Sequence, residues 1–156
     1  MRFKKRIGVL ALALVVFCVT TTFAYQQRVD LPGMKPPTKH EQNVQVEFIT
    51  PEELKAKIAN NESLAIVDLR SQASFEQSDQ TIKGSLHTKV RRVSYRLREL
   101  PRDREIITYC ACPSDEAAAL GARALLANGF KRVRVLKGGW NAWIQAGGQV
   151  QPKPKV

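Results

Sequence analysis

Two cysteines, Cys110 and Cys112, stand one residue apart at the end of an apolar run and directly before a helical pattern. Thiolate is the nucleophilic form of cysteine, and the positive end of a helix together with unpaired backbone N–H groups lowers the pKa of a thiol. The stretch that follows Cys110 can curl its amides around the sulfur and form an anion-binding nest. We therefore interpret Cys110 as a nucleophile, with an inert buried thiol as the alternative.

Strand and helix patterns alternate around these cysteines. A strand at 44–49 is followed by a helix that begins with a capping box of Thr50, Pro51 and Glu53. Further predicted elements are a buried strand at 64–70, a short helix, a turn and a brief strand within 71–87, an amphipathic helix at 90–100, a buried strand at 105–109, a helix capped by Ser114 and stopped by Gly129, a strand at 132–136 and a closing helix at 140–147. This alternation predicts an α/β fold, a small three-layer structure whose mostly parallel central sheet is flanked by helices.

Polar residues end one of these strands, as Cys110 ends another. In folds with a parallel sheet, ligands bind at the carboxyl ends of the strands. Asp68 and Arg70 end the strand at 64–70. We expect them to form an ion pair that orders the edge of the site, with direct contact to a substrate as the alternative.

Both ends of the chain differ in composition from this domain, which we place at 44–148. Residues 1–24 combine a basic start, an apolar stretch and small residues, which predicts a signal peptide or a signal anchor. Residues 25–43 predict a flexible spacer, and 149–156 a disordered tail. Either kind of leader would export the domain across the cytoplasmic membrane to the periplasm, where it would be soluble or associated with the membrane through its N-terminal segment.

The chain is basic, with 25 Lys and Arg against 14 Asp and Glu and a net charge of +11. Many of the cations lie on the outer face of the predicted helix at 90–100. Such a face could attract an anionic substrate, an acidic partner or lipid head groups, although a solvated face that aids solubility is the simpler interpretation. We expect no nucleic-acid partner for an exported protein. Two cysteines do not complete a tetrahedral zinc site, so we expect no metal, and nothing in the sequence calls for a cofactor.

Four stretches of the sequence resemble, in order, motifs of the rhodanese-like (sulfurtransferase) domain family. They are IVDLRSQASF, TIKGSLH, LPRDREIITYC and GFKRVRVLKGGWNAWIQAG, within about residues 45–148. The resemblance implies that Cys110 takes a sulfane sulfur from a small-molecule or protein-bound donor, becomes a persulfide, and passes the outer sulfur to a thiol acceptor or reductant. The loop residues expected to hold that sulfur are Ala111, Pro113, Ser114, Asp115 and Glu116.

The loop departs from the family pattern at two positions. Members that use thiosulfate commonly carry a basic residue near the sixth position of the loop, where this chain has Asp115 and Glu116. Carboxylates there would repel a dianionic donor and raise the pKa of the thiol, which disfavours thiosulfate and favours neutral or protein-bound persulfides. The second departure is Thr81, which stands where the family often has histidine.

Cys112 adds a further possibility to a persulfide on Cys110. Its thiolate could attack the inner sulfur, release hydrosulfide and leave an internal disulfide that a reductant must reopen. Alternatively, Cys112 packs under the loop without reacting. The interpretation that follows is an exported sulfurtransferase, and two alternatives stay open. One is a catalytically silent rhodanese-fold module that binds a protein, and the other is a dithiol redox protein that uses Cys110 and Cys112.

Overall fold

The structure, a computed structural model, describes residues 44–154. Its elements are β1 (Glu47–Ile49), α3 (Pro51–Ala59), β2 (Leu64–Asp68), α4 (Gln72–Glu76), β3 (Gln80–Ile82), β4 (Ser85–His87), η2 (Val90–Tyr95), η3 (Leu97–Glu99), β5 (Glu105–Tyr109), α5 (Glu116–Ala127), β6 (Val133–Leu136), α6 (Gly139–Gln145) and β7 (Val150–Pro152). Five strands form the central sheet in the order β1-β6-β5-β2-β4, and every neighbouring pair is parallel. The predicted α/β fold with a mostly parallel sheet is confirmed.

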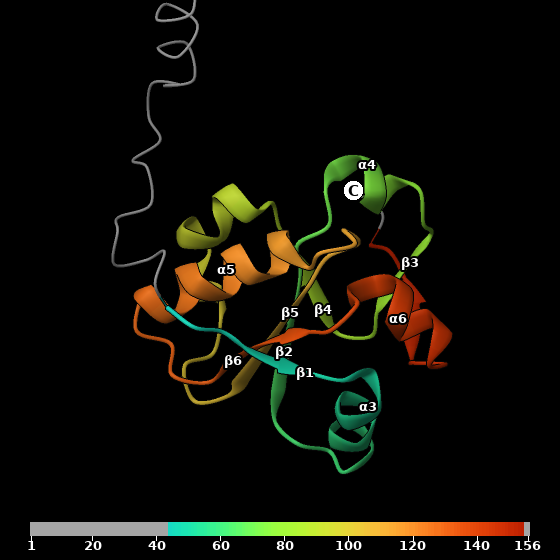
Figure 1. The fold of residues 1–156 in the computed structure, drawn as a ribbon, viewed down its shortest axis with the longest axis horizontal. Helices are drawn as coiled ribbons and strands as arrows, with labels where there is room; N and C mark the ends of the chain where they lie inside the picture. Colours follow the sequence, from blue (N-terminus) through green and yellow to red (C-terminus); the bar gives the residue numbers. More distant parts are fainter. Residues whose placement is uncertain (1–43, 155–156) are drawn as a thin grey trace, which may run out of the picture. The chain divides into compact units, whose positions relative to one another are not determined.

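Helices cover both faces of the sheet and make the three layers. Figure 1 shows α5 on one face, and α3 with α6 on the other. Successive residues of a strand point to opposite faces, so each strand supplies both cores. In β5, Ile106 packs with Val93 and Leu125 in one cluster, whereas Ile107 packs with Leu54 and Trp143 in the other.

The predicted N-cap of α3 at Thr50 is confirmed, but the Glu53 side chain pairs with Arg134 (2.7 Å) and does not complete the capping box. The predicted cap of α5 is wrong. The Thr50 hydroxyl accepts a hydrogen bond from the Glu53 N–H (3.2 Å). Helix α5 begins one residue later than expected, after Asp115 rather than Ser114, and the Asp115 side chain caps nothing. That carboxylate instead accepts a hydrogen bond from the Gly138 N–H (2.7 Å), so a contact with a distant turn replaces the local cap.

The amphipathic α-helix predicted at 90–100 is also wrong. Two 3-10 helices, η2 and η3, occupy this segment. Val90 and Val93 are three residues apart, a spacing that suits a helix of three residues per turn as well as an α-helix. Valine is a weak α-helix former, and Lys89 gives the segment no side-chain cap. Local sequence therefore provides little that would favour the α form.

The disordered tail predicted at 149–156 is wrong for Val150–Pro152, which forms β7. This strand pairs antiparallel with β3, which is not part of the central sheet. The indole N–H of Trp143 donates to the carbonyl of Gln149 (3.1 Å), and the backbone N–H of Lys153 donates to the carbonyl of Asp79 (2.9 Å). Strand β7 forms because β3 offers unpaired backbone groups with which it can form hydrogen bonds.

The predicted leader at 1–24 and spacer at 25–43 lie outside the described residues. Within 44–154, the structure contains no helix with both the length and the apolar character needed to span a bilayer.

Candidate functional site

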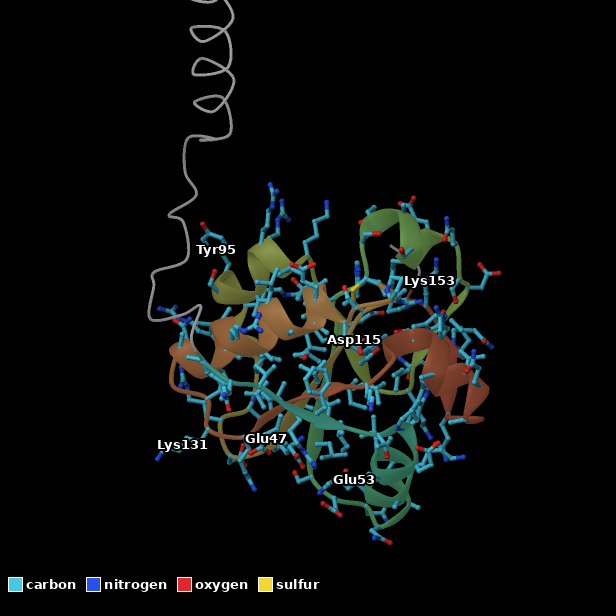
Figure 2. The ribbon with its side chains drawn as sticks, in the orientation of Figure 1. Glu47, Glu53, Tyr95, Asp115, Lys131 and Lys153 are labelled. Carbon is cyan, nitrogen blue, oxygen red and sulfur yellow. A yellow bond between two sulfur atoms is a disulfide. The ribbon has the colours of Figure 1, made fainter. Side chains whose placement is uncertain are left out.

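Three adjacent parallel strands bring the predicted site residues to one edge of the sheet. In β2, β5 and β4, Asp68 is in register with Tyr109 on one side and with His87 on the other. Cys110 directly follows β5, and Arg70 lies two residues beyond the end of β2. The cysteine loop and the Asp68–Arg70 pair therefore lie at the same C-terminal edge, where Figure 2 shows the sulfur atoms near Asp115.

Cys110 and Cys112 form a disulfide, with Cα atoms 5.7 Å apart. Cys110 is 1% exposed, whereas Cys112 is only partly buried. A thiol that arrives from solvent therefore meets Cys112 first. The backbone N–H of Cys112 donates to Sγ of Cys110 (3.4 Å). If Cys112 is attacked, Cys110 is the leaving thiolate, and a hydrogen-bond donor already points at its sulfur.

Two carbonyl groups of the loop accept backbone hydrogen bonds. The carbonyl of Cys110 accepts a hydrogen bond from the Trp140 N–H (2.8 Å), and that of Cys112 accepts one from the Asp115 N–H (3.2 Å). Gly139, at φ +51°, lies so close that a Cβ there would clash with the Cys110 carbonyl. The start of α6 thus holds the loop by a close backbone contact that only glycine permits.

The predicted loop residues fall into two groups. Pro113, Ser114 and Glu116 are exposed and Ala111 is half-buried, so these residues are open to a ligand. Asp115 is buried, in a left-handed conformation at φ 54°. One of its oxygens accepts the Gly138 hydrogen bond and the other has no hydrogen-bond partner. Asp115 therefore anchors the loop from below, while its neighbours form the outer surface.

Asp68 and Arg70 form an ion pair (2.7 Å) in which both side chains are completely buried. Nε of Arg70 also bonds the carboxylate, and one Nη donates to the Gln80 carbonyl (3.1 Å), whereas the other Nη has no partner. The guanidinium lies 4.3 Å from the Trp140 ring centre and 5.0 Å from that of Phe75. This burial favours the expected structural role, because no part of the Arg70 side chain faces solvent.

Sequence reasoning missed a set of hydroxyl groups around the Asp68 carboxylate. The Tyr109 hydroxyl donates to it (2.7 Å), as does the Thr81 hydroxyl (3.1 Å), and Ser85 lies 2.6 Å from Thr81. Burial, together with the charge of Asp68, raises the pKa of Tyr109 well above its ordinary value, so its hydroxyl stays protonated and can donate. The only sequence signal was the position of Tyr109 beside Cys110, and that gave no hint of Asp68.

No metal-binding cluster occurs in the described part of the chain, where no three His, Cys, Asp or Glu residues are grouped to hold an ion. Cys110 and Cys112 are joined to each other, so they offer no free thiolate pair for one.

Residues 50–146 match the family described as "Rhodanese-like domain". A sulfurtransferase of Allochromatium vinosum is 30% identical over 102 residues, which cover 65% of this chain and 92% of that protein. YrkF of Bacillus subtilis, a proposed sulfur carrier protein, is 33% identical over 95 residues, or 61% of this chain and 49% of YrkF. Among solved structures, the rhodanese-like domain of the Alr3790 protein from Anabaena is similar with a TM-score of 0.59 and 25% identity, over 70% of this chain and 81% of that chain.

Proposed function

The chain belongs to the rhodanese-like domain family, and on that premise we propose that it transfers sulfane sulfur through a persulfide on Cys110. The observation that carries the proposal is the position of this cysteine. It lies between β5 and α5, at the edge of the sheet where ligands of such folds bind, with the Cys112 N–H directed at its sulfur. A relative named as a sulfurtransferase supports the reaction class.

A cycle that begins from the disulfide starts with reduction. A thiolate attacks Sγ of Cys112, the more exposed of the two residues, and Cys110 leaves as a thiolate. A second thiol then attacks the mixed disulfide on Cys112. In sum, two external thiols are oxidised to one external disulfide, and the Cys110–Cys112 disulfide is reduced to two thiols.

Sulfur uptake and release follow as two displacements. The Cys110 thiolate attacks the outer sulfur of a donor persulfide, R–S–SH, so that a new S–S bond forms on Cys110 and the donor leaves as R–S⁻. An acceptor thiolate then attacks the outer sulfur of the Cys110 persulfide. The acceptor becomes the persulfide, and Cys110 is a thiolate again.

Cys112 provides a second way out of the persulfide state. Its thiolate can attack the inner sulfur of the Cys110 persulfide, which forms the Cys110–Cys112 disulfide and releases hydrosulfide. That product is the disulfide described above, and its Cα separation of 5.7 Å is within the ordinary range for such a bond.

The negative charge of the loop affects which sulfur donors the protein can use. Asp115 and Glu116 place carboxylates where thiosulfate-using members commonly have a cation. Donors that carry their negative charge at the reacting end are therefore disfavoured, whereas persulfides with an uncharged reacting end, free or on a protein, are favoured.

Mass spectrometry of the intact, reduced protein tests this proposal. After exposure to a persulfide donor, the wild-type protein should gain the mass of one sulfur atom, and Cys110→Ser should gain none. Cys112→Ser should keep the added sulfur longer than the wild type, because it lacks the resolving thiol. Equal sulfur uptake by Cys110→Ser would contradict the proposal.

A dithiol redox protein is the second candidate, and the disulfide itself favours it. In that role, the Cys110–Cys112 bond would oxidise a partner dithiol by two successive exchanges, and no sulfur atom would move. The same mass measurement separates the two, because a redox protein would cycle between the disulfide and dithiol masses without gaining sulfur.

We extend the proposal to a place of action outside the cytoplasmic membrane. The support is the sequence of residues 1–24, with its basic start and apolar stretch. Fractionation of cells that express the full chain tests it. Recovery of the protein only in the cytoplasm would contradict export.

A further inference from the structure

A basic pocket of about 510 Å³ lies at the C-terminal end of β4. Gln72 of α4 forms part of its wall. No acidic side chain lines it, and the other lining residues are His87, Thr88, Lys89, Arg92, Tyr95 and Arg96. Cations, an amide and a hydroxyl around one open cavity are the groups that bind an anion with several acceptor oxygens.

The 3-10 form of η2 explains which side chains face this pocket. Side chains three residues apart lie in one row along such a helix. Lys89, Arg92 and Tyr95 form the row that lines the pocket. Val90 and Val93 form another row, which packs into the core. The row of cations is therefore held toward the pocket by the burial of the valines.

Within residues 44–154, two cations of the pocket have no carboxylate partner. Arg96 is occupied, since it bonds both carboxylate oxygens of Glu99 and the His87 carbonyl (3.0 Å). Lys89 and Arg92 are exposed, and in the described part of the chain neither forms a salt bridge. Their positive charge is available to a ligand.

The pocket lies near the Cys110 loop. Only β2 separates β4 from β5, and with about 4.8 Å between neighbouring strands the ends of β4 and β5 are about 10 Å apart. Val90 and Cys112 both pack against the core cluster that contains Cys110. Figure 2 shows Tyr95 and the nitrogen-tipped side chains beside it toward the same end of the molecule as the sulfur atoms.

His87 connects the pocket wall to the edge of the site. Its ring stacks on Phe75 of α4 with 3.7 Å between ring centres. Its Nε2 donates to the backbone carbonyl of Arg70 (3.2 Å). These contacts fix the wall of the pocket relative to the end of β2, so a ligand bound there has a defined position relative to the loop.

We propose that this pocket binds the anionic end of the small thiol that exchanges sulfur with the Cys110 loop. The inference rests on the proposed function, and it adds the chemical class of the molecule. That molecule carries its thiol or persulfide at one end and one or more carboxylates at the other, about 10 Å away, which is close to the reach of three extended residues. Its reaction is the balanced displacement described above.

This arrangement also accommodates the acidic loop. Asp115 and Glu116 carry negative charge in the loop that contains Cys110, whereas Lys89 and Arg92 carry positive charge in the pocket. A molecule with separated thiol and carboxylate groups can place its thiol at the acidic loop and its carboxylates in the basic pocket. Thiosulfate has no such separation.

Two matched peptides test the pocket, acetyl-Cys-Gly-Gly-Asp and its neutral counterpart acetyl-Cys-Gly-Gly-Asn-amide. The rate at which each peptide reduces the Cys110–Cys112 disulfide is measured on the full chain at low salt. With the wild-type protein, the acidic peptide should react faster than the neutral one. In the double variant Lys89→Gln/Arg92→Gln, the rate with the acidic peptide should be about threefold to tenfold lower than in the wild type, because two exposed charge contacts are removed. The neutral peptide should be unaffected.

Arg91→Gln is the matched control, since Arg91 is exposed on η2 but does not line the pocket. It should leave the rate with the acidic peptide nearly unchanged. An equal loss in Arg91→Gln and in an Arg92→Gln single variant would overturn the proposal, because the effect would then come from the overall charge.

A binding measurement separates failure of the pocket from failure of the proposed function. The peptide acetyl-Ser-Gly-Gly-Asp has no thiol, and the proposal expects it to shift the NMR signals of Thr88 and Tyr95 in the wild type but not in the double variant. Such binding without any sulfur gain by Cys110 would support the pocket and contradict the transferase. Sulfur gain without any such shift would overturn the pocket and leave the transferase in place.

Discussion

The paired strands β2 and β5 have a network of charges at each end, and the two networks differ in their exposure to water. At the N-terminal end, Glu105 pairs with Arg134 (2.5 Å) and Lys57 (3.3 Å), and the side chains of all three are 15–20% exposed. At the C-terminal end, Asp68 and Arg70 pair with both side chains at 0% exposure. The same pair of strands thus has a water-accessible charge network at one end and a sealed, fully buried network at the other.

The difference indicates which end of the sheet needs fixed geometry. Long side chains in contact with water can change partners at little cost, as in the network around Glu105. When an ion pair is buried, the free energy lost by removing both charges from water can exceed their attraction, so burial by itself adds little stability. Asp68 also accepts hydrogen bonds from Thr81 and from Tyr109, the residue that precedes Cys110. The sealed network is therefore best explained as a support that holds this edge in one arrangement.

Breaking the sealed pair should have the largest effect on stability. Asp68→Asn leaves the Arg70 guanidinium buried without a counter-charge, and we expect a loss of about 3–5 kcal/mol in the free energy of unfolding. Urea denaturation measures it. The double variant Asp68→Asn/Arg70→Met removes the uncompensated charge and should regain part of the loss. A loss in Asp68→Asn no larger than that of an exposed pair would contradict the comparison.

Disturbing the backbone contact beneath the cysteine loop should have an intermediate effect. Gly139→Ala places a Cβ against the Cys110 carbonyl at φ +51°, so the loop must shift, and we expect a loss of more than about 1 kcal/mol and a changed rate of disulfide reduction. Gly147→Ala is the control. Gly147 has a similar φ of +65° with open space around it. The variant should therefore lose stability from backbone strain alone, and its Cys110–Cys112 disulfide should be reduced at the wild-type rate.

Disturbing the water-accessible network around Glu105 should have the smallest effect on stability, and one that depends on pH. Burial by itself would raise the pKa of Glu105, but Arg134 and Lys57 outweigh it and hold the pKa below the usual 4.5. The folded state thus favours the carboxylate, and this stabilisation is complete above pH 4.5 and disappears as the pH falls through the lowered value.

Glu105→Gln should therefore be less stable than the wild type at pH 7, by about 1 kcal/mol or less because solvent screens the pair. The difference should shrink below the usual carboxyl pKa and in high salt. Thermal unfolding at several pH values measures it. Glu99→Gln, in the exposed Arg96–Glu99 pair, serves as the control and should change stability little at any pH. A Glu105→Gln effect that grew as the pH fell would show that the sign is wrong.

Local patterns in the sequence were sufficient for the fold and for the position of Cys110. The N-cap at Thr50, the apolar runs and the Ala-rich segment each act over a few residues, and those elements form where predicted. Alternation of strands and helices then requires a parallel sheet, and a parallel sheet places strand ends on one edge.

Sequence reasoning failed where a distant segment decides the local structure. Asp115 is drawn away from capping by Gly138, and the tail is ordered by β3, which lies about 70 residues earlier. The bond between Tyr109 and Asp68 joins residues 41 positions apart. None of these partners leaves a periodic signal. The prediction of an α-helix at η2 failed for a different reason, because the apolar spacing of this segment fits two kinds of helix.

The pairing of β7 with β3 has a practical consequence for work with this protein. Lys153 bonds the backbone carbonyl of Phe75 in α4 through its Nζ (2.8 Å), so the last described residues lie beside the helix that contributes Gln72 to the basic pocket. An affinity tag or fluorophore fused after Val156 would start within a few residues of this contact. A bulky group attached to the Lys153 side chain would remove this contact with α4, so a label there would disturb the helix that forms part of the pocket wall.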